Sequence, residues 1–207
     1  PTSANLDSIA FLQYTGGTTG LSKGAVLTHG NIVAAILQAE AWFTPAIRRV
    51  GDVRQINCIA ALPLYHIFAL TACAVFGARK GGMLIMVPNP RDIPGFIKLL
   101  KSHPNIHIFP GVNTLFNALI HRPDFSKIKL PNLLVTIGGG MAMQKVVADE
   151  WQKRCPELDI SKFTAASPKE LRSIEGFKKL DALIKSSDGW KASERFYYIA
   201  KMICHAS

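Results

Sequence analysis

A short segment near the start of the chain combines the residue types that can hold phosphate groups. Tyr14 to Gly24 reads Tyr-Thr-Gly-Gly-Thr-Thr-Gly-Leu-Ser-Lys-Gly. Its glycines let a ligand approach the backbone closely, and successive N–H groups in such a turn can form a concave anion site. The threonine hydroxyls add donors, and Lys23 adds a positive charge on a flexible stem. We therefore predict that this loop binds a polyphosphate, with a simple flexible turn as the alternative.

The spacing of this loop differs from that of two familiar nucleotide-binding loops. A Walker loop has GxxxxGK followed by Ser or Thr, whereas Lys23 lies between Ser22 and Gly24. A dinucleotide fingerprint, GxGxxG, opens a helix, whereas this loop leads towards a second predicted strand. Neither of these two binding modes is therefore expected.

Strands and helices that alternate along the chain must position the loop. Apolar runs bounded by Gly or Pro predict strands at 9–14, 25–28, 56–62, 83–87, 106–109 and 133–137. Helical spacing of apolar residues predicts helices at 28–43, 67–76, 94–101, 113–121 and 141–154. We expect Pro45 to end the first helix and Pro110 to end the fifth strand. This alternation predicts an α/β fold, a mostly parallel open sheet flanked by helices.

The pattern changes after Cys155. From Ser167 onward we predict two amphipathic helices and no strand. The chain is therefore divided into an α/β part at 1–155 and a helical C-terminal tail of unknown origin at 156–207.

Composition limits the classes of function. The net charge is +10, but the basic residues are dispersed without interleaved aromatic residues, which favours anionic ligands over nucleic acid. Four cysteines without CxxC spacing and six histidines without HExxH indicate neither a disulfide framework nor a protein metal site, and favour a cytoplasmic location. No apolar run reaches the roughly 20 residues of a membrane-spanning helix. Because Pro1 is not an initiator Met, we expect the chain to begin inside a longer protein.

Three segments in this order resemble the adenylate-forming (AMP-binding) enzymes. The loop Tyr14–Gly24 is similar to their phosphate loop, YTSGTTGxPKG, and with Ala25–His29 it is most similar to long-chain fatty-acid–CoA ligases. Leu62–Phe68, here called the second motif, resembles a family motif beside the acyl pocket. Ile137–Met143, here called the Gly-rich turn, resembles a segment that lines the nucleotide and acyl sites. The resemblance covers about 7–154 and implies that 1–155 is a partial N-terminal domain of an acyl-CoA synthetase.

The resemblance implies a reaction and a set of site residues. In this family a fatty acid carboxylate attacks the α-phosphate of ATP, and CoA then displaces AMP to give a thioester. The residues implied for the ATP phosphates, with Mg²⁺ bridging their oxygens, are Thr15, Gly16, Gly17, Thr18, Thr19, Gly20 and Lys23. Gly138, Gly139 and Gly140 would allow close ligand approach, and His66 would shape the acyl pocket. Lys23 and His66 are the catalytic candidates; read alone, His66 has a core histidine after a strand as its alternative.

The resemblance also has gaps. Ser22 stands where the family usually has Pro, and 156–207 lacks the family's Tyr-Gly-x-Thr-Glu motif, its later ribose-binding Asp and its C-terminal domain with a catalytic Lys. We therefore expect a ligase fragment that is incomplete for catalysis. The alternative is a catalytically inactive or vestigial module that binds nucleotide phosphates. Self-association through exposed apolar surface and peripheral contact with the inner membrane are further expectations.

Overall fold

The structure, a computed structural model, describes residues 4–15, 23–48, 53–139 and 143–156. The described strands are β1 (Ile9–Thr15), β2 (Lys23–Thr28), β3 (Asn57–Ala60), β4 (Met83–Met86), β5 (Ile108–Gly111) and β6 (Val135–Gly138). The described helices are α1 (His29–Arg48), α2 (Ile67–Ala69), the π-helix η1 (Leu70–Val75), α3 (Phe76–Arg79), α4 (Ile93–Ser102), α5 (Asn113–Ile120), the 3₁₀-helix η2 (Phe125–Lys127) and α6 (Lys145–Arg154). The predicted tail at 156–207 lies almost wholly outside the described residues.

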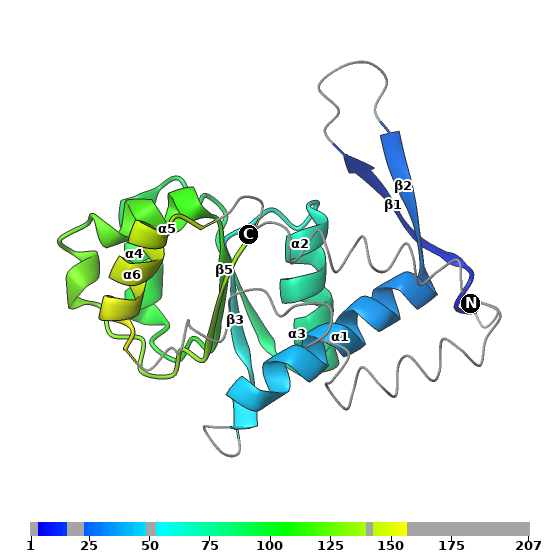
Figure 1. Cartoon of the computed structure of the whole chain (residues 1–207), viewed down its shortest axis with the longest axis horizontal. Helices are drawn as coiled ribbons and strands as arrows, with labels where there is room; N and C mark the ends of the chain where they lie inside the picture. Colours follow the sequence, from blue (N-terminus) through cyan, green and yellow to red (C-terminus); the bar gives the residue numbers. More distant parts are fainter. Residues whose placement is uncertain (1–3, 16–22, 49–52, 140–142, 157–207) are drawn as a thin grey trace.

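Four strands form the parallel sheet that the sequence predicted. Their order is β4-β3-β5-β6, and each neighbouring pair is parallel. Helices α1, α2, η1 and α3 lie on one face of this sheet, and α4, α5 and α6 lie on the other (Figure 1). Covering both faces is what an all-parallel sheet of apolar strands requires, so the α/β prediction is confirmed.

An aromatic cluster fills the space between the sheet and α4, α5 and α6. The ring of Phe109, on β5, lies 5.4 Å from Phe116, 5.5 Å from Trp151 and 5.8 Å from Phe96, measured between centroids. All four side chains are almost completely buried. The indole N–H of Trp151 donates to Thr136 Oγ1 at 3.2 Å, so its polar atom is also satisfied.

A second apolar cluster joins the opposite face of the sheet to α1, α2, η1 and α3. Phe43 of α1 meets Phe76 of α3 edge-to-face, with ring centroids 4.9 Å apart. Leu27 of β2 also belongs to this cluster, and it anchors the inner end of the first hairpin.

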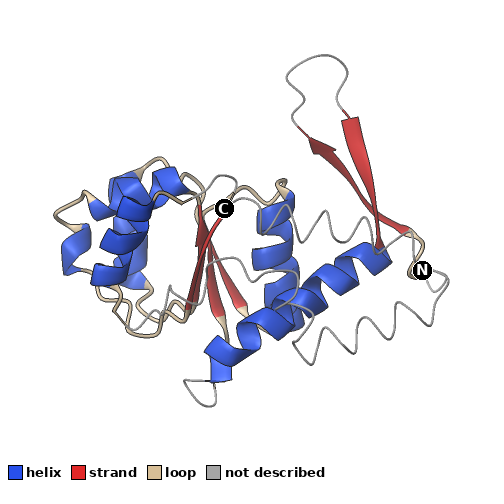
Figure 2. Ribbon diagram, in the orientation of Figure 1, coloured by secondary structure: helices blue, strands red, loops and turns tan. Residues whose placement is uncertain are grey.

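Strands β1 and β2 do not join the parallel sheet. They pair with each other in antiparallel register, from Ile9 opposite Thr28 to Thr15 opposite Lys23, and form a separate hairpin. This hairpin projects from the layered part of the molecule beyond the start of α1 (Figure 2). Much of its apolar surface, including Leu12, Tyr14 and Val26, is exposed.

Both proline predictions are wrong. Helix α1 continues through Pro45 to Arg48, although a proline removes one helical hydrogen bond. Packing on both sides of Pro45, by Phe43 and Ile47 against the second apolar cluster, offsets that loss. Strand β5 runs through Pro110 to Gly111, because its pairing with β6 continues there while its pairing with β3 is registered only at Ile108.

The last helix begins later than predicted. Helix α6 starts at Lys145 rather than Met141, since Met143 and Gln144 are not helical. The extended Gln144 is fixed by its backbone N–H, which donates to Asn113 Oδ1 at 3.0 Å. None of the helices in the described ranges has the length and apolar character needed to cross a membrane.

Candidate functional site

The candidate site lies where the parallel strands end. The chain leaves β3 into the second motif and leaves β6 into the Gly-rich turn, and β5 lies between these two strands. The backbone N–H of Gly139 donates to the carbonyl oxygen of Gly111 at 3.1 Å, which fixes the start of the turn against the end of β5. The carboxyl edge of an α/β sheet is the usual position of a ligand site.

Gly139 lets the Gly-rich turn pack directly against the second motif. A Cβ atom at position 139 would lie 2.6 Å from Cε1 of Phe68, far inside van der Waals contact. Because the aromatic ring is rigid, only glycine fits at position 139 without moving Phe68. At Gly138 the nearest atom is Cε of the flexible Met143 side chain, also at 2.6 Å, so the constraint there is weaker.

His66 occupies the first position before helix α2. Its Nδ1 accepts a hydrogen bond from the backbone N–H of Phe68 at 3.2 Å, so it caps the helix. In the neutral ring this bond leaves the hydrogen on Nε2, which can donate to a ligand oxygen. The side chain of His66 is exposed rather than buried in the core. This position excludes the core-histidine alternative.

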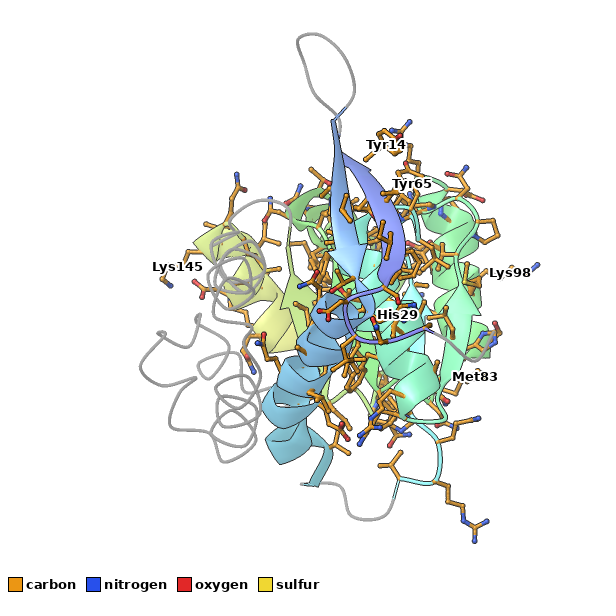
Figure 3. All side chains as sticks on the ribbon, turned by 90° about the vertical axis from the view of Figure 1, so that its right-hand side faces the viewer. Tyr14, His29, Tyr65, Met83, Lys98 and Lys145 are labelled. Atoms are coloured by element: carbon orange, nitrogen blue, oxygen red, sulfur yellow. The ribbon has the colours of Figure 1, made fainter. Side chains whose placement is uncertain are left out.

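The outer end of the hairpin carries the two described residues that flank the predicted phosphate loop. Thr15 and Lys23 lie opposite each other as the last registered pair of β1 and β2. Gln13 of β1 donates from Nε2 to the carbonyl oxygen of Tyr65 at 2.6 Å, which connects the hairpin to the second motif. Figure 3 shows Tyr14 and Tyr65 at the same end of the molecule. The second motif thus contacts both the Gly-rich turn and Gln13, the residue directly before the first segment of the resemblance.

The structure places some of the predicted site residues and not others. Thr15 and Lys23 close the hairpin, His66 caps α2, and Gly138 and Gly139 lie at the carboxyl end of β6. The predicted site residues outside the described ranges are Gly16, Gly17, Thr18, Thr19, Gly20 and Gly140.

Sequence reasoning missed two residues that connect these segments. Gln13 was read only as part of a strand, and Phe68 only as part of the second motif. Gln13 had no sequence signal, because its partner is a backbone carbonyl 52 residues away. The sequence partly indicated the contact between Phe68 and Gly139, since a glycine near a strand often marks a close approach of another group to the backbone.

A buried histidine at the opposite edge of the sheet is structural. His107 Nδ1 accepts from the backbone N–H of Asn57 at 3.0 Å, where β3 begins. Burial lowers the pKa of His107 and favours the neutral ring that this bond requires. The Oδ1 atom of Asn57 is buried there without a hydrogen-bond partner. Lying at the amino ends of the strands, His107 is remote from the segments described above.

Metal binding finds no support in the described residues. Polar side chains near the carboxyl edge include the Gln13 amide, the His66 imidazole and the Asn113 amide. Within the described ranges, no three or more His, Cys, Asp or Glu side chains are grouped to hold a metal ion.

Comparison with known proteins identifies the family. The sequence profile described as AMP-binding enzyme matches residues 1–163. A long-chain-fatty-acid–CoA ligase of Yersinia pestis is 46% identical over 152 residues, which is 73% of this chain and 26% of that protein. The corresponding ligase of Haemophilus influenzae is 47% identical over 148 residues, 71% of this chain and 26% of that protein. The chain thus spans about a quarter of the length of these curated relatives.

Solved structures agree with this result. The N-terminal domain of FACL13 from Mycobacterium tuberculosis superimposes with a TM-score of 0.61 at 27% identity, covering 76% of this chain and 37% of that one. ATP-bound MatB from Rhodopseudomonas palustris gives a TM-score of 0.60 at 26% identity, covering 72% and 27%. With its profile match, its ligase relatives and the shared arrangement of sheet and helices, the chain belongs to the AMP-binding enzyme family.

Proposed function

We propose that this chain is part of the adenylation domain of an ATP-dependent long-chain fatty-acid–CoA ligase. The observation that supports the proposal most strongly is the convergence of its three motif segments. Gln13, directly before the first segment, contacts the second motif at Tyr65, and Phe68 of that motif contacts Gly139 of the Gly-rich turn. If the glycine clusters were unrelated flexible turns, there would be no reason for these segments to meet at the carboxyl edge of the sheet.

The proposed first step joins two anions and therefore needs charge neutralisation and positioning. A fatty acid carboxylate attacks the α-phosphate of ATP, forming an acyl-adenylate and releasing pyrophosphate. The loop 15–23 would hold the β- and γ-phosphates through backbone N–H groups and threonine hydroxyls, and Lys23 would supply the positive charge. Mg²⁺ would bridge oxygens of these phosphates.

The second motif and the Gly-rich turn would act on the acyl group. His66 caps α2 through Nδ1, so its Nε2–H would remain available to a carboxylate oxygen of the substrate. Gly138 and Gly139 would let the adenylate lie close to the backbone at the end of β6. The second step, in which CoA displaces AMP to give the thioester, is proposed for the longer ligase and not for this chain alone.

We propose that this chain alone binds ATP weakly and does not complete the reaction. It spans about a quarter of its ligase relatives, and 156–207 has no Tyr-Gly-x-Thr-Glu motif. Loss of even one preorganised contact to the transition state costs about 3 kcal/mol, or roughly 100-fold in rate. An inactive module that binds nucleotide phosphates is the second candidate function, and the same missing motif favours it.

An assay of both half-reactions separates the two candidates. The chain is incubated with palmitate, ATP, Mg²⁺ and CoA, and pyrophosphate release and palmitoyl-CoA are measured. We expect no detectable palmitoyl-CoA; slow pyrophosphate release that requires palmitate would indicate a partial ligase, and none at all would indicate the inactive module. Palmitoyl-CoA formed at an ordinary enzyme rate, about 1 per second or faster, would contradict the proposed incompleteness.

The proposed partners are small-molecule ligands, and a second copy of the chain or a membrane surface is a further proposed partner. Fatty acid, ATP and CoA follow from the ligase proposal. Exposed apolar residues on the hairpin, such as Leu12 and Val26, support self-association or peripheral contact with a membrane. We propose no nucleic-acid partner, because the basic residues are dispersed along the sequence.

A further inference from the structure

Gln13 makes a hydrogen bond that spans two segments of the candidate site. It lies on β1 opposite Ala25, two positions before Thr15, where the phosphate loop begins. Its Nε2 donates to the Tyr65 carbonyl at 2.6 Å and lies 3.5 Å from the Tyr14 carbonyl. The shorter contact is within hydrogen-bond distance, and its donor and acceptor are 52 residues apart in sequence.

The acceptor of this bond lies in the turn that positions His66. The turn is closed by a bond from the His66 backbone N–H to the Pro63 carbonyl at 3.0 Å. The Tyr65 side chain is 82% exposed, so its packing contributes little to holding the turn. The side-chain amide of Gln13 therefore binds the backbone of Tyr65, the residue directly before the helix cap at His66.

Other bonds attach the hairpin near its base. The His29 N–H donates to the Ser8 carbonyl at 2.9 Å, and the Gly30 N–H donates to the Leu6 carbonyl at 2.7 Å. Both bonds lie at the end of the hairpin that adjoins α1. The bond from Gln13 lies nearer the phosphate loop, so it controls where that end of the hairpin sits relative to the second motif.

We propose that Gln13 is a positioning residue, whose amide couples the position of the phosphate-loop hairpin to the turn that presents His66. A ligand that shifts the outer hairpin then also shifts the carbonyl of Tyr65 and the start of α2. For the identity of that ligand, ATP, the inference rests on the proposed function. The coupling between the two segments does not depend on it.

Hydrogen exchange of the 207-residue chain tests the coupling without any ligand. Gln13→Leu removes the donor at similar size and without a charge. The control is Gln55→Leu, the same change at an exposed glutamine. In Gln13→Leu we expect amides within 62–70 to exchange about five-fold faster, the effect of losing one hydrogen bond. Gln55→Leu should leave them unchanged, and Gln13→Lys, which restores a donor, should return them to within about two-fold of wild type.

A second arm adds saturating ATP with Mg²⁺. In the wild type we expect slower exchange in both 9–14 and 62–70, and in Gln13→Leu only in 9–14. If ATP changes neither segment of the wild type, the proposed function fails, while the unliganded comparison still decides the role of Gln13. Equal exchange in 62–70 for unliganded wild type and Gln13→Leu would overturn the inference, as would an identical ATP response of that segment in both proteins.

Discussion

The parallel sheet and the β1–β2 hairpin are stabilised by different interactions. In the sheet, side chains such as Ile59, Ile108 and Phe109 are fully buried between two layers of helices. On the hairpin, Leu12 is 58% exposed and Val26 53% exposed, although the two residues are register partners. The sheet is therefore fixed by apolar burial, whereas the outer hairpin depends on backbone pairing and a few hydrogen bonds. The buried sheet therefore provides the edge of the candidate site, and the more exposed hairpin carries Thr15 and Lys23, which flank the segment proposed to bind phosphate.

The largest effect is expected in the aromatic cluster beneath the sheet. Phe109→Ala removes a ring that contacts Phe96, Phe116 and Trp151. Because the surrounding side chains cannot fully fill the cavity, the free energy of unfolding should fall by about 3–5 kcal/mol. Urea denaturation followed by tryptophan fluorescence measures it. A loss below about 1 kcal/mol would mean that the sheet is not stabilised by this cluster.

A smaller but more local effect is expected at the Gly-rich turn. Gly139→Ala places a Cβ atom 2.6 Å from the Phe68 ring, so the ring or the turn must move. We expect a loss of about 1–3 kcal/mol in the free energy of unfolding. The matched control is Gly77→Ala in helix α3, where no atom lies within 4 Å of the new Cβ.

For Gly77→Ala we expect no loss, or a gain of up to about 1 kcal/mol, because alanine has the higher helix propensity. Thermal unfolding of the two variants side by side measures the difference. Equal stability of both would contradict the close packing of the second motif against the Gly-rich turn.

Acidification should weaken the sheet through His107. Because burial lowers the pKa of His107, the unfolded chain binds a proton more readily than the folded one. The stabilisation is complete above the unfolded pKa of about 6.5 and declines as the pH falls below it. The expected loss is about 1 kcal/mol, comparable to the bond from the Asn57 N–H.

Urea denaturation as a function of pH tests this prediction. His107→Asn keeps an acceptor that does not titrate, so stability should depend less on pH below about 6.5. His121→Asn, at an exposed position, is the control and should retain the wild-type profile. If His107→Asn also retains it, the buried histidine does not cause the acid sensitivity.

The smallest effect is expected on the hairpin itself. Leu12→Ala truncates a largely exposed side chain, so the free energy of unfolding should change by less than about 0.5 kcal/mol. The measurement is the same urea titration. A loss above about 1.5 kcal/mol would show that this surface is buried in solution, as self-association would produce, and sedimentation velocity would then reveal the assembly.

The alternation of strands and helices was readable from the sequence, but several contacts were not. Apolar runs located β3 and β4 well, and helical spacing of apolar residues located α5. In β3, burial on both faces leaves a continuous apolar signal. Local rules failed at Pro45 and Pro110, where tertiary packing and the pattern of strand pairing outweighed the usual effect of proline. At both positions the effect of the proline depends on a neighbouring helix or strand, which the local sequence does not identify.

The sequence predicted the segments of the candidate site but not the contacts between them. Glycine, threonine and lysine in a fixed order predict a phosphate loop, since those residue types have direct chemical roles, and this stays a prediction. The bond from Gln13 to Tyr65 could not be predicted, because any residue can offer a backbone carbonyl and 52 positions separate the two. The separation of the hairpin from the parallel sheet was missed for a similar reason, because apolar strands of either kind look alike in sequence.

The central claim is that the hairpin ending at Lys23 holds the phosphates of ATP. Calorimetric titration of ATP with Mg²⁺ into wild type, Lys23→Ala and Lys98→Ala tests it most directly. Lys98 is an exposed lysine on α4 and serves as the matched control. We predict that Lys23→Ala weakens binding by about 10-fold or more, as expected for loss of a charged hydrogen bond, while Lys98→Ala binds like wild type. Equal affinity of Lys23→Ala and wild type, or no binding by wild type at millimolar ATP, would contradict the claim.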